Sequence, residues 1–153
     1  MRDHFVSPDA VYGVILYSVL IAGISDENSS ALQVLVLSLI SLLIFWSAHV
    51  FAGTVAGHGE HRLRSALWHS LTHSSGMLYA SILPSLALVA GALHWLSADD
   101  AVSLALLLAM IVLGLLGYRS FAQRKSPVIV RVLGGLGTAF FGLLVIILNI
   151  LVH

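Results

Sequence analysis

The sequence contains no cysteine, and only 9% of its residues are charged. Without cysteine the chain can form no disulfide, offer no thiolate to a metal and use no thiol nucleophile. A typical soluble domain carries about 25% charged residues, so this composition indicates a chain that is not surrounded by water on all sides. Basic and acidic residues are equal in number at seven each, which leaves no basic surplus for nucleic acid.

Sequence motifs of the common hydrolases and transferases are also missing. The chain has no G-x-S-x-G motif, no phosphate-binding glycine loop and no pair of carboxylates at a spacing suited to acid–base catalysis. Its LGGLG run lies inside an apolar block, where such a run is typical of helix packing. We therefore expect a protein that is not an enzyme.

Apolar residues, by contrast, make up 59% of the chain and occur in long blocks separated by short polar connections. A helix needs about 20 apolar residues to cross a hydrocarbon core roughly 30 Å thick. The predicted fold class is an all-α integral membrane protein in which residues 1–153 form a single polytopic domain. Five transmembrane helices are predicted, over residues 8–25, 31–56, 75–96, 98–118 and 128–152.

The basic residues are expected on one side of this five-helix bundle. They lie before the first block, in the connections after the second and fourth blocks, or at the start of the fifth block: Arg2, Arg62, Arg64, Arg119, Arg124, Lys125 and Arg131. The connections after the first and third blocks carry only acidic charges. The positive-inside rule then predicts a cell-membrane protein with a cytoplasmic N-terminus and an external C-terminus.

Four of the eight histidines lie in the connection between the second and third blocks: His58, His61, His69 and His73. At about 100° per residue, the leucines at positions 63, 67 and 71 form one stripe and the histidines lie opposite. This pattern predicts an amphipathic helix over residues 59–73 that lies along the inner membrane surface.

The same four histidines are candidate metal ligands. His58 and His61 are spaced i,i+3, while His69 and His73 are spaced i,i+4, so each pair could share one ion. A complete zinc site normally has three or four ligands, which these pairs alone do not guarantee. The alternative is a histidine-rich helix face that contacts only water and lipid headgroups. The cofactor is unknown at this point, with a divalent metal ion as the candidate.

Few polar side chains lie within the predicted spans, and these are candidates for an ion pathway because buried polar groups in a membrane often mark transport routes. Serine hydroxyls and a carbonyl freed by Pro84 can coordinate a passing cation, or can satisfy one another within the bundle. The candidate pathway residues are Asp9, His49, Ser38, Ser41, Ser81 and Ser85.

These features predict a small membrane transporter or channel for a cation, either a divalent metal or a proton. One alternative is an accessory subunit of a larger membrane complex without chemistry of its own. Another is a haem-binding membrane protein that uses His49 with His69 or His73 as axial ligands. Because five short helices rarely enclose a path alone, we expect a homo-oligomer or a membrane complex in the lipid bilayer, with no nucleic acid partner.

Overall fold

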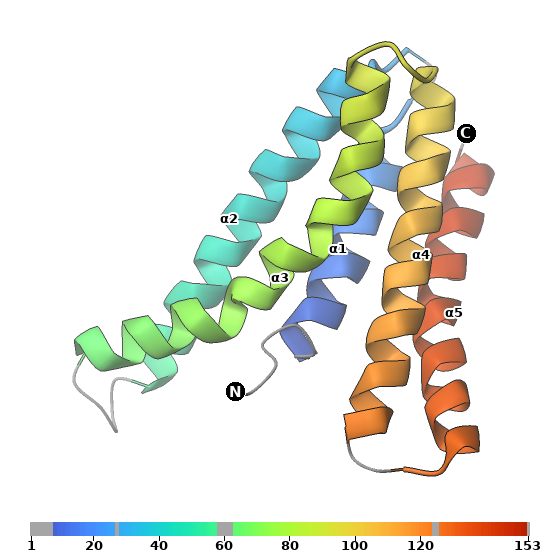
Figure 1. Ribbon diagram of the computed structural model, residues 1–153. Coiled ribbons are helices and arrows are strands. Elements are labelled where there is room, and N and C mark those ends of the chain that lie inside the picture. The colour runs from blue at the N-terminus through green and yellow to red at the C-terminus, as the bar shows by residue number, and fades with distance from the viewer. Residues whose placement is uncertain (1–7, 27, 58–62, 124–125, 153) are drawn as a thin grey trace.

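The computed structural model describes residues 8–26, 28–57, 63–123 and 126–152, and this part of the chain consists of helices joined by short connections. The helices are α1 (Pro8–Ile24), α2 (Ala31–Gly57), α3 (Leu63–Ala92), α4 (Ala98–Gln123) and α5 (Val128–Val152). Successive helices run in opposite directions, so the start of α1 and the end of α5 lie at opposite ends of the bundle (Figure 1). The predicted all-α class is confirmed.

Helices α2, α3, α4 and α5 are each long and apolar enough to cross a membrane, as expected of a multi-pass membrane protein. Helix α1 is shorter, with 17 residues. At ~1.5 Å per residue it is about 26 Å long, close to the lower limit for a span. It nevertheless contacts each of the other four helices, which places it inside the bundle.

The core forms around the buried face of α1. Val14, Tyr17 and Ile21 are fully buried, and they pack in clusters with apolar residues of the other helices, among them Leu88 and Leu113. Most of α5 and the outer face of α2 remain apolar and exposed. In a membrane, such faces contact lipid without cost, because lipid tails are as apolar as the side chains themselves.

Small residues let the helices approach closely within this one chain. Gly13 of α1 lies against the backbone of Met77 in α3, and Gly142 of α5 lies against the backbone of Met110 in α4. Gly117 of α4 faces Thr138 of α5, whose hydroxyl donates a hydrogen bond to the carbonyl of Leu113 (2.8 Å). Close backbone approach of this kind is the usual way in which membrane helices gain packing contacts.

A separate amphipathic helix over residues 59–73 is not confirmed. Residues 58–62 lie outside the described part of the chain, and from Leu63 onward the segment is the first third of the continuous helix α3. Its buried face consists of small residues, Ala66, Ser70 and Ser74, the first two of which fit against glycines of α2. This small-residue contact with α2 explains why the segment continues into the span rather than turning away from it.

The middle of α3 bends, as Figure 1 shows. Pro84 lies inside this helix, where it removes one backbone hydrogen bond and crowds the preceding turn. The helix ends at Ala92, earlier than the predicted residue 96, because His94 takes a positive φ of 60°. The amide of Trp95 donates to the carbonyl of Ala90 and that of His94 to Gly91, the hydrogen-bond pattern of a Schellman motif.

Charged residues separate to the two ends of the bundle. Arg64, Arg119 and Arg131 lie at or next to the helix ends nearest the start of α1, which we call the arginine end. The opposite end carries Asp26, Asp99 and Asp100 and is called the aspartate end. In the described residues, this distribution agrees with the alternation of charge predicted from the sequence.

Candidate functional site

Asp9 is the centre of a polar cluster at the arginine end. Its Oδ2 accepts a hydrogen bond from Nδ1 of His73 at 2.6 Å, and its Oδ1 lies 3.6 Å from Nε2 of His49. The three residues come from α1, α3 and α2, so the fold brings together three predicted site residues from distant parts of the chain. We call them the Asp9 cluster.

The position of Asp9 follows from local structure. An aspartate in the first turn of a helix is stabilised by the positive end of the helix dipole. One turn further along α1, Gly13 lies against Met77. These two residues are 64 positions apart in the sequence, as Asp9 and His73 are. Helices α1 and α3 are therefore parallel and in register, and the absence of a side chain at Gly13 sets the short distance between Asp9 and His73.

Aromatic neighbours orient both imidazoles. The ring of His49 stacks on Tyr12 with centroids 6.3 Å apart, and the ring of His73 stacks on His69 at 6.0 Å. The Asp9 side chain is only 13% exposed, whereas those of His49 and His73 are 44% and 56% exposed. The imidazoles are therefore partly exposed on the surface of the bundle, while the carboxylate is covered by the helices around it.

The cluster combines one carboxylate with two imidazoles, which are side chains that can carry or lose a proton. In the described part of the chain, the ion-pair partners of Asp9 are these two histidines. With neutral imidazoles the cluster carries the single negative charge of Asp9. When both imidazoles take up a proton, the net charge changes sign.

A second polar group lies near the middle of the bundle. The hydroxyl of Tyr17 is 2.7 Å from Oγ of Ser85 and accepts a hydrogen bond from Oγ of Ser38 at 3.4 Å. The hydroxyl of Ser85 in turn donates to the carbonyl of Ser81 at 2.8 Å. Tyr17 and Ser38 are fully buried. This Tyr17 layer therefore lies about 12 Å along α1 from Asp9, at ~1.5 Å per residue over eight residues.

The candidate pathway residues thus divide into two groups. Asp9 and His49 belong to the Asp9 cluster, while the hydroxyls of Ser38 and Ser85 belong to the Tyr17 layer, to which Ser81 contributes only its backbone carbonyl. Ser41 is only half-buried, and the hydrogen bonds found among the described residues do not include it. Tyr17 was missed, although a tyrosine eight residues after Asp9 in an otherwise apolar helix is a signal that the sequence contains.

The predicted metal ligands are only partly described. His58 and His61 lie outside the described residues. Among the residues that are described, no group of three or more histidine, cysteine, aspartate or glutamate side chains could hold a metal ion. His69 and His73 stack their rings with an interplanar angle of 22°. The four-histidine metal site remains a prediction, and the contact made by His73 in the structure is with Asp9.

Relatives give no further information about this site. The chain was compared with protein-family models, with curated protein sequences and with solved structures, and none of the three comparisons finds a match.

Proposed function

We propose that this protein moves a cation across a membrane, with the Asp9 cluster as the ion-binding site at the cytoplasmic end. The observation that carries the proposal is the contact of one covered aspartate with histidines from two other helices. Ionisable groups are expensive in a membrane domain and usually serve a function there. The proton is the cation that best suits the cluster, because each of its three members can accept one.

The orientation follows from the charges. The arginine end is assigned to the cytoplasm, because basic residues are retained on that side of a membrane. All five helices are then proposed to cross the bilayer, with α1 enclosed by the other four. This orientation gives the cytoplasmic N-terminus and external C-terminus expected from the sequence. Exposed Trp68 in the first half of α3 and Trp95 beyond its end suit the two membrane interfaces.

A route for the cation would follow α1. From the arginine end it passes the Asp9 cluster, the Tyr17 layer and finally Ser25 near the aspartate end. Between the Asp9 cluster and the Tyr17 layer, the Gly13–Met77 contact closes this route. Between the Tyr17 layer and Ser25, the buried side chains of Ile21 and Leu88 fill it. We infer that the structure is a closed conformation, and that straightening of α3 at its proline bend would separate α1 from α3.

The geometry disfavours a haem held between His49 and His73. Axial ligands must face each other across an open slot, but the Asp9 carboxylate lies between His49 and His73 and contacts both. A divalent metal is a second candidate cargo. Its ligand set would be complete only with the histidines at positions 58 and 61.

The experiment is proton flux into proteoliposomes that enclose a pH-sensitive dye and carry a potassium-valinomycin potential. We expect flux above that of protein-free vesicles, and a loss of about tenfold or more in Asp9→Asn, as for removal of a proton-transfer group. His73→Gln should also lose flux, whereas His94→Gln, an exposed histidine at the other end, should keep it. Equal flux in Asp9→Asn and the wild type would refute the proposal.

A parallel measurement separates the proton from a metal. Elemental mass spectrometry of tag-free protein, before and after incubation with zinc or ferrous iron, should find no stoichiometric metal if the cargo is a proton. About one ion per chain that disappears in the His69→Ala/His73→Ala variant would instead identify a metal site. Absence of both flux and metal would leave the accessory subunit as the better interpretation.

A further inference from the structure

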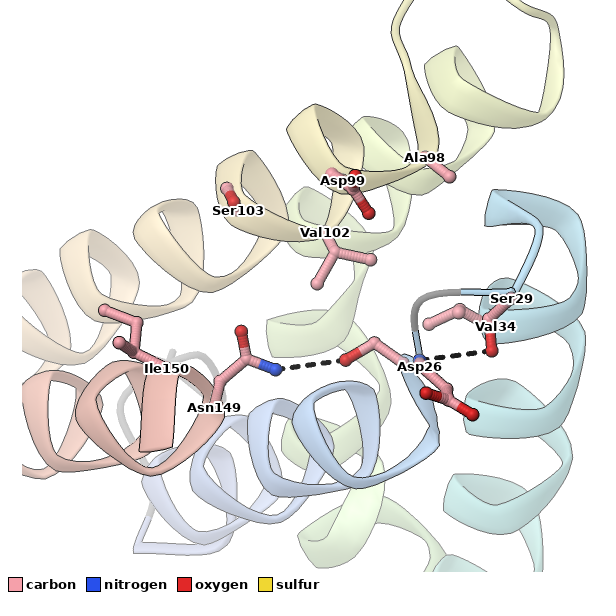
Figure 2. A pocket seen from close by; sticks show the side chains of 10 residues that line it. Asp26, Ser29, Val34, Ala98, Asp99, Val102, Ser103, Asn149 and Ile150 are labelled. Atoms are coloured by element: carbon pink, nitrogen blue, oxygen red, sulfur yellow. Dashed lines mark hydrogen bonds between the residues drawn. The ribbon is translucent and has the colours of Figure 1, made fainter. Parts of the chain in front are cut away.

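A cavity at the aspartate end is separate from both polar groups described above. It measures about 340 Å³ and lies between the C-terminal ends of α1 and α5 and the N-terminal parts of α2 and α4 (Figure 2). From Asp9 it is roughly 24 Å away along α1, at ~1.5 Å per residue over the sixteen residues to Ser25. Pockets of about 300 Å³ or more commonly bind small molecules, so the cavity is large enough for a ligand of several atoms.

Its lining combines an apolar wall with acidic and amide groups. Val34, Val102 and Ile150 provide the apolar surface, and the carboxylates of Asp26 and Asp99 lie at its edge. All the described charged residues of the aspartate end are acidic, and the described arginines lie at the opposite end. The electrostatic potential in the cavity therefore favours a cationic group over an anionic one.

Asn149 supplies a hydrogen-bond acceptor. It belongs to the apolar helix α5, and its Nδ2 donates to the carbonyl of Ala22 (3.4 Å) and to Oγ of Ser25 (3.1 Å). The bond to Ala22 fixes which end of the amide is the donor, because a carbonyl can only accept. The amide oxygen points away from Ser25 toward the α4 side of the cavity (Figure 2), and none of the described residues donates a hydrogen bond to it.

We propose that this cavity binds an organic ammonium group with a short apolar substituent. The ammonium N–H donates to Oδ1 of Asn149 and pairs with the carboxylates of Asp26 and Asp99, while the substituent packs against Val34 and Val102. A bare metal ion would leave the apolar wall unused, and a neutral ligand would make no use of the negative charge that Asp26 and Asp99 bring to the cavity. The ammonium comes either from a free amine or from a lipid headgroup. The inference does not rest on the function proposed for the Asp9 cluster.

The test is calorimetric titration of the detergent-purified full chain with n-butylammonium and with 1-butanol, a neutral molecule of the same number of heavy atoms. We expect saturable binding of the ammonium with a Kd below about 1 mM and no measurable binding of the alcohol. Asp99→Asn should weaken binding about three- to fivefold, as expected for loss of one exposed charge partner, and Asp26→Asn/Asp99→Asn roughly tenfold.

The matched control is Asp100→Asn. Asp100 is the next residue and has the same charge, but its carboxylate accepts a hydrogen bond from Ser97 and does not line the cavity. Its substitution should change the Kd less than about twofold, because it removes only a distant, screened charge. Equal effects of the Asp99 and Asp100 variants, equal binding of the alcohol, or no saturable binding would each overturn the proposal.

Lipid nanodiscs distinguish the two sources of the ammonium. Nanodiscs of phosphatidylglycerol diluted with an uncharged glycolipid contain no lipid ammonium group, whereas nanodiscs with phosphatidylethanolamine in place of the glycolipid do, and the two carry the same surface charge. If the headgroup is the natural occupant, the apparent affinity for n-butylammonium will fall in the phosphatidylethanolamine discs, because lipid competes for the cavity. An affinity that is the same in both discs assigns the cavity to a free amine. Asn149→Leu should weaken binding in either lipid, with thermal unfolding recorded to check that the variant is folded.

Discussion

The close approach of α1 and α3 at Gly13 gives the sharpest prediction. A Cβ at this position would lie 2.6 Å from Cα of Met77, 2.9 Å from its Cβ and 3.0 Å from its carbonyl oxygen. Carbon atoms in contact are normally about 3.5–4.0 Å apart, so Gly13→Ala must move the two backbones apart by about 1 Å. Overpacking of this kind costs about 1–3 kcal/mol. The displacement would also lengthen the Asp9–His73 hydrogen bond, which lies one turn away on the same two helices.

Gly23→Ala is the matched control, because it makes the same change in the same helix at a position with no atoms within 4 Å. Each substitution replaces a helical glycine by alanine, which by itself stabilises the helix by roughly 0.5–1 kcal/mol. The difference in stability between the two variants therefore measures the clash at Gly13. We expect Gly13→Ala to be less stable than Gly23→Ala by about 1–3 kcal/mol in thermal unfolding followed by tryptophan fluorescence. At about 2–4 °C per kcal/mol for a chain of this size, the difference is measurable. Equal melting temperatures would show that α1 and α3 do not approach as described.

Three further predictions concern other contacts. Tyr17→Phe should lower stability by about 0.5–1.5 kcal/mol in denaturant titration, because Ser38 and Ser85 lose the hydroxyl with which both form hydrogen bonds. Its control, Tyr118→Phe on the exposed surface, should have no effect on stability. Gly142→Ala should lower the melting temperature by forcing Met110 away, and Gly137→Ala, with open space around it, should leave it unchanged or raise it. His94→Gly should raise stability by about 1 kcal/mol in the same assay, because glycine takes the positive φ of the helix cap without strain; a loss would contradict this explanation.

Much of the fold could be predicted from the sequence because a membrane imposes strong constraints on length and polarity. The five helices were expected, and the start of α1 was placed at Pro8, where proline suits the first helical position. The predicted end of α4, at Tyr118, is five residues too early, because polar residues follow it but no helix breaker lies before Gln123. A polar segment can continue a helix beyond the apolar span, and α4 continues to Gln123.

The site was only partly predictable. Asp9, His49 and His73 were each singled out, but for different reasons, and His73 was assigned to a metal-ligand pair with His69 on the same helix. Their convergence depends on the register of α1 against α3, which is set by the fit of Gly13 on Met77. Spacing within one helix gives no information about contacts between helices. For the same reason the sequence did not indicate Asn149, whose partners are more than 120 positions away.

The central position of α1 has a consequence for how the protein is made. This helix leaves the ribosome before the four helices that cover it, and its partner Asn149 is separated from Ala22 by 127 residues. Until α3 and α4 follow, the Tyr17 hydroxyl lacks its partner on α3, and the small residues of α1 lack their neighbours. Nascent chains that end after α2 should therefore be held by an insertase or degraded. Quality control of this protein would then depend on the last helices to be synthesised, which complete the enclosure of the first.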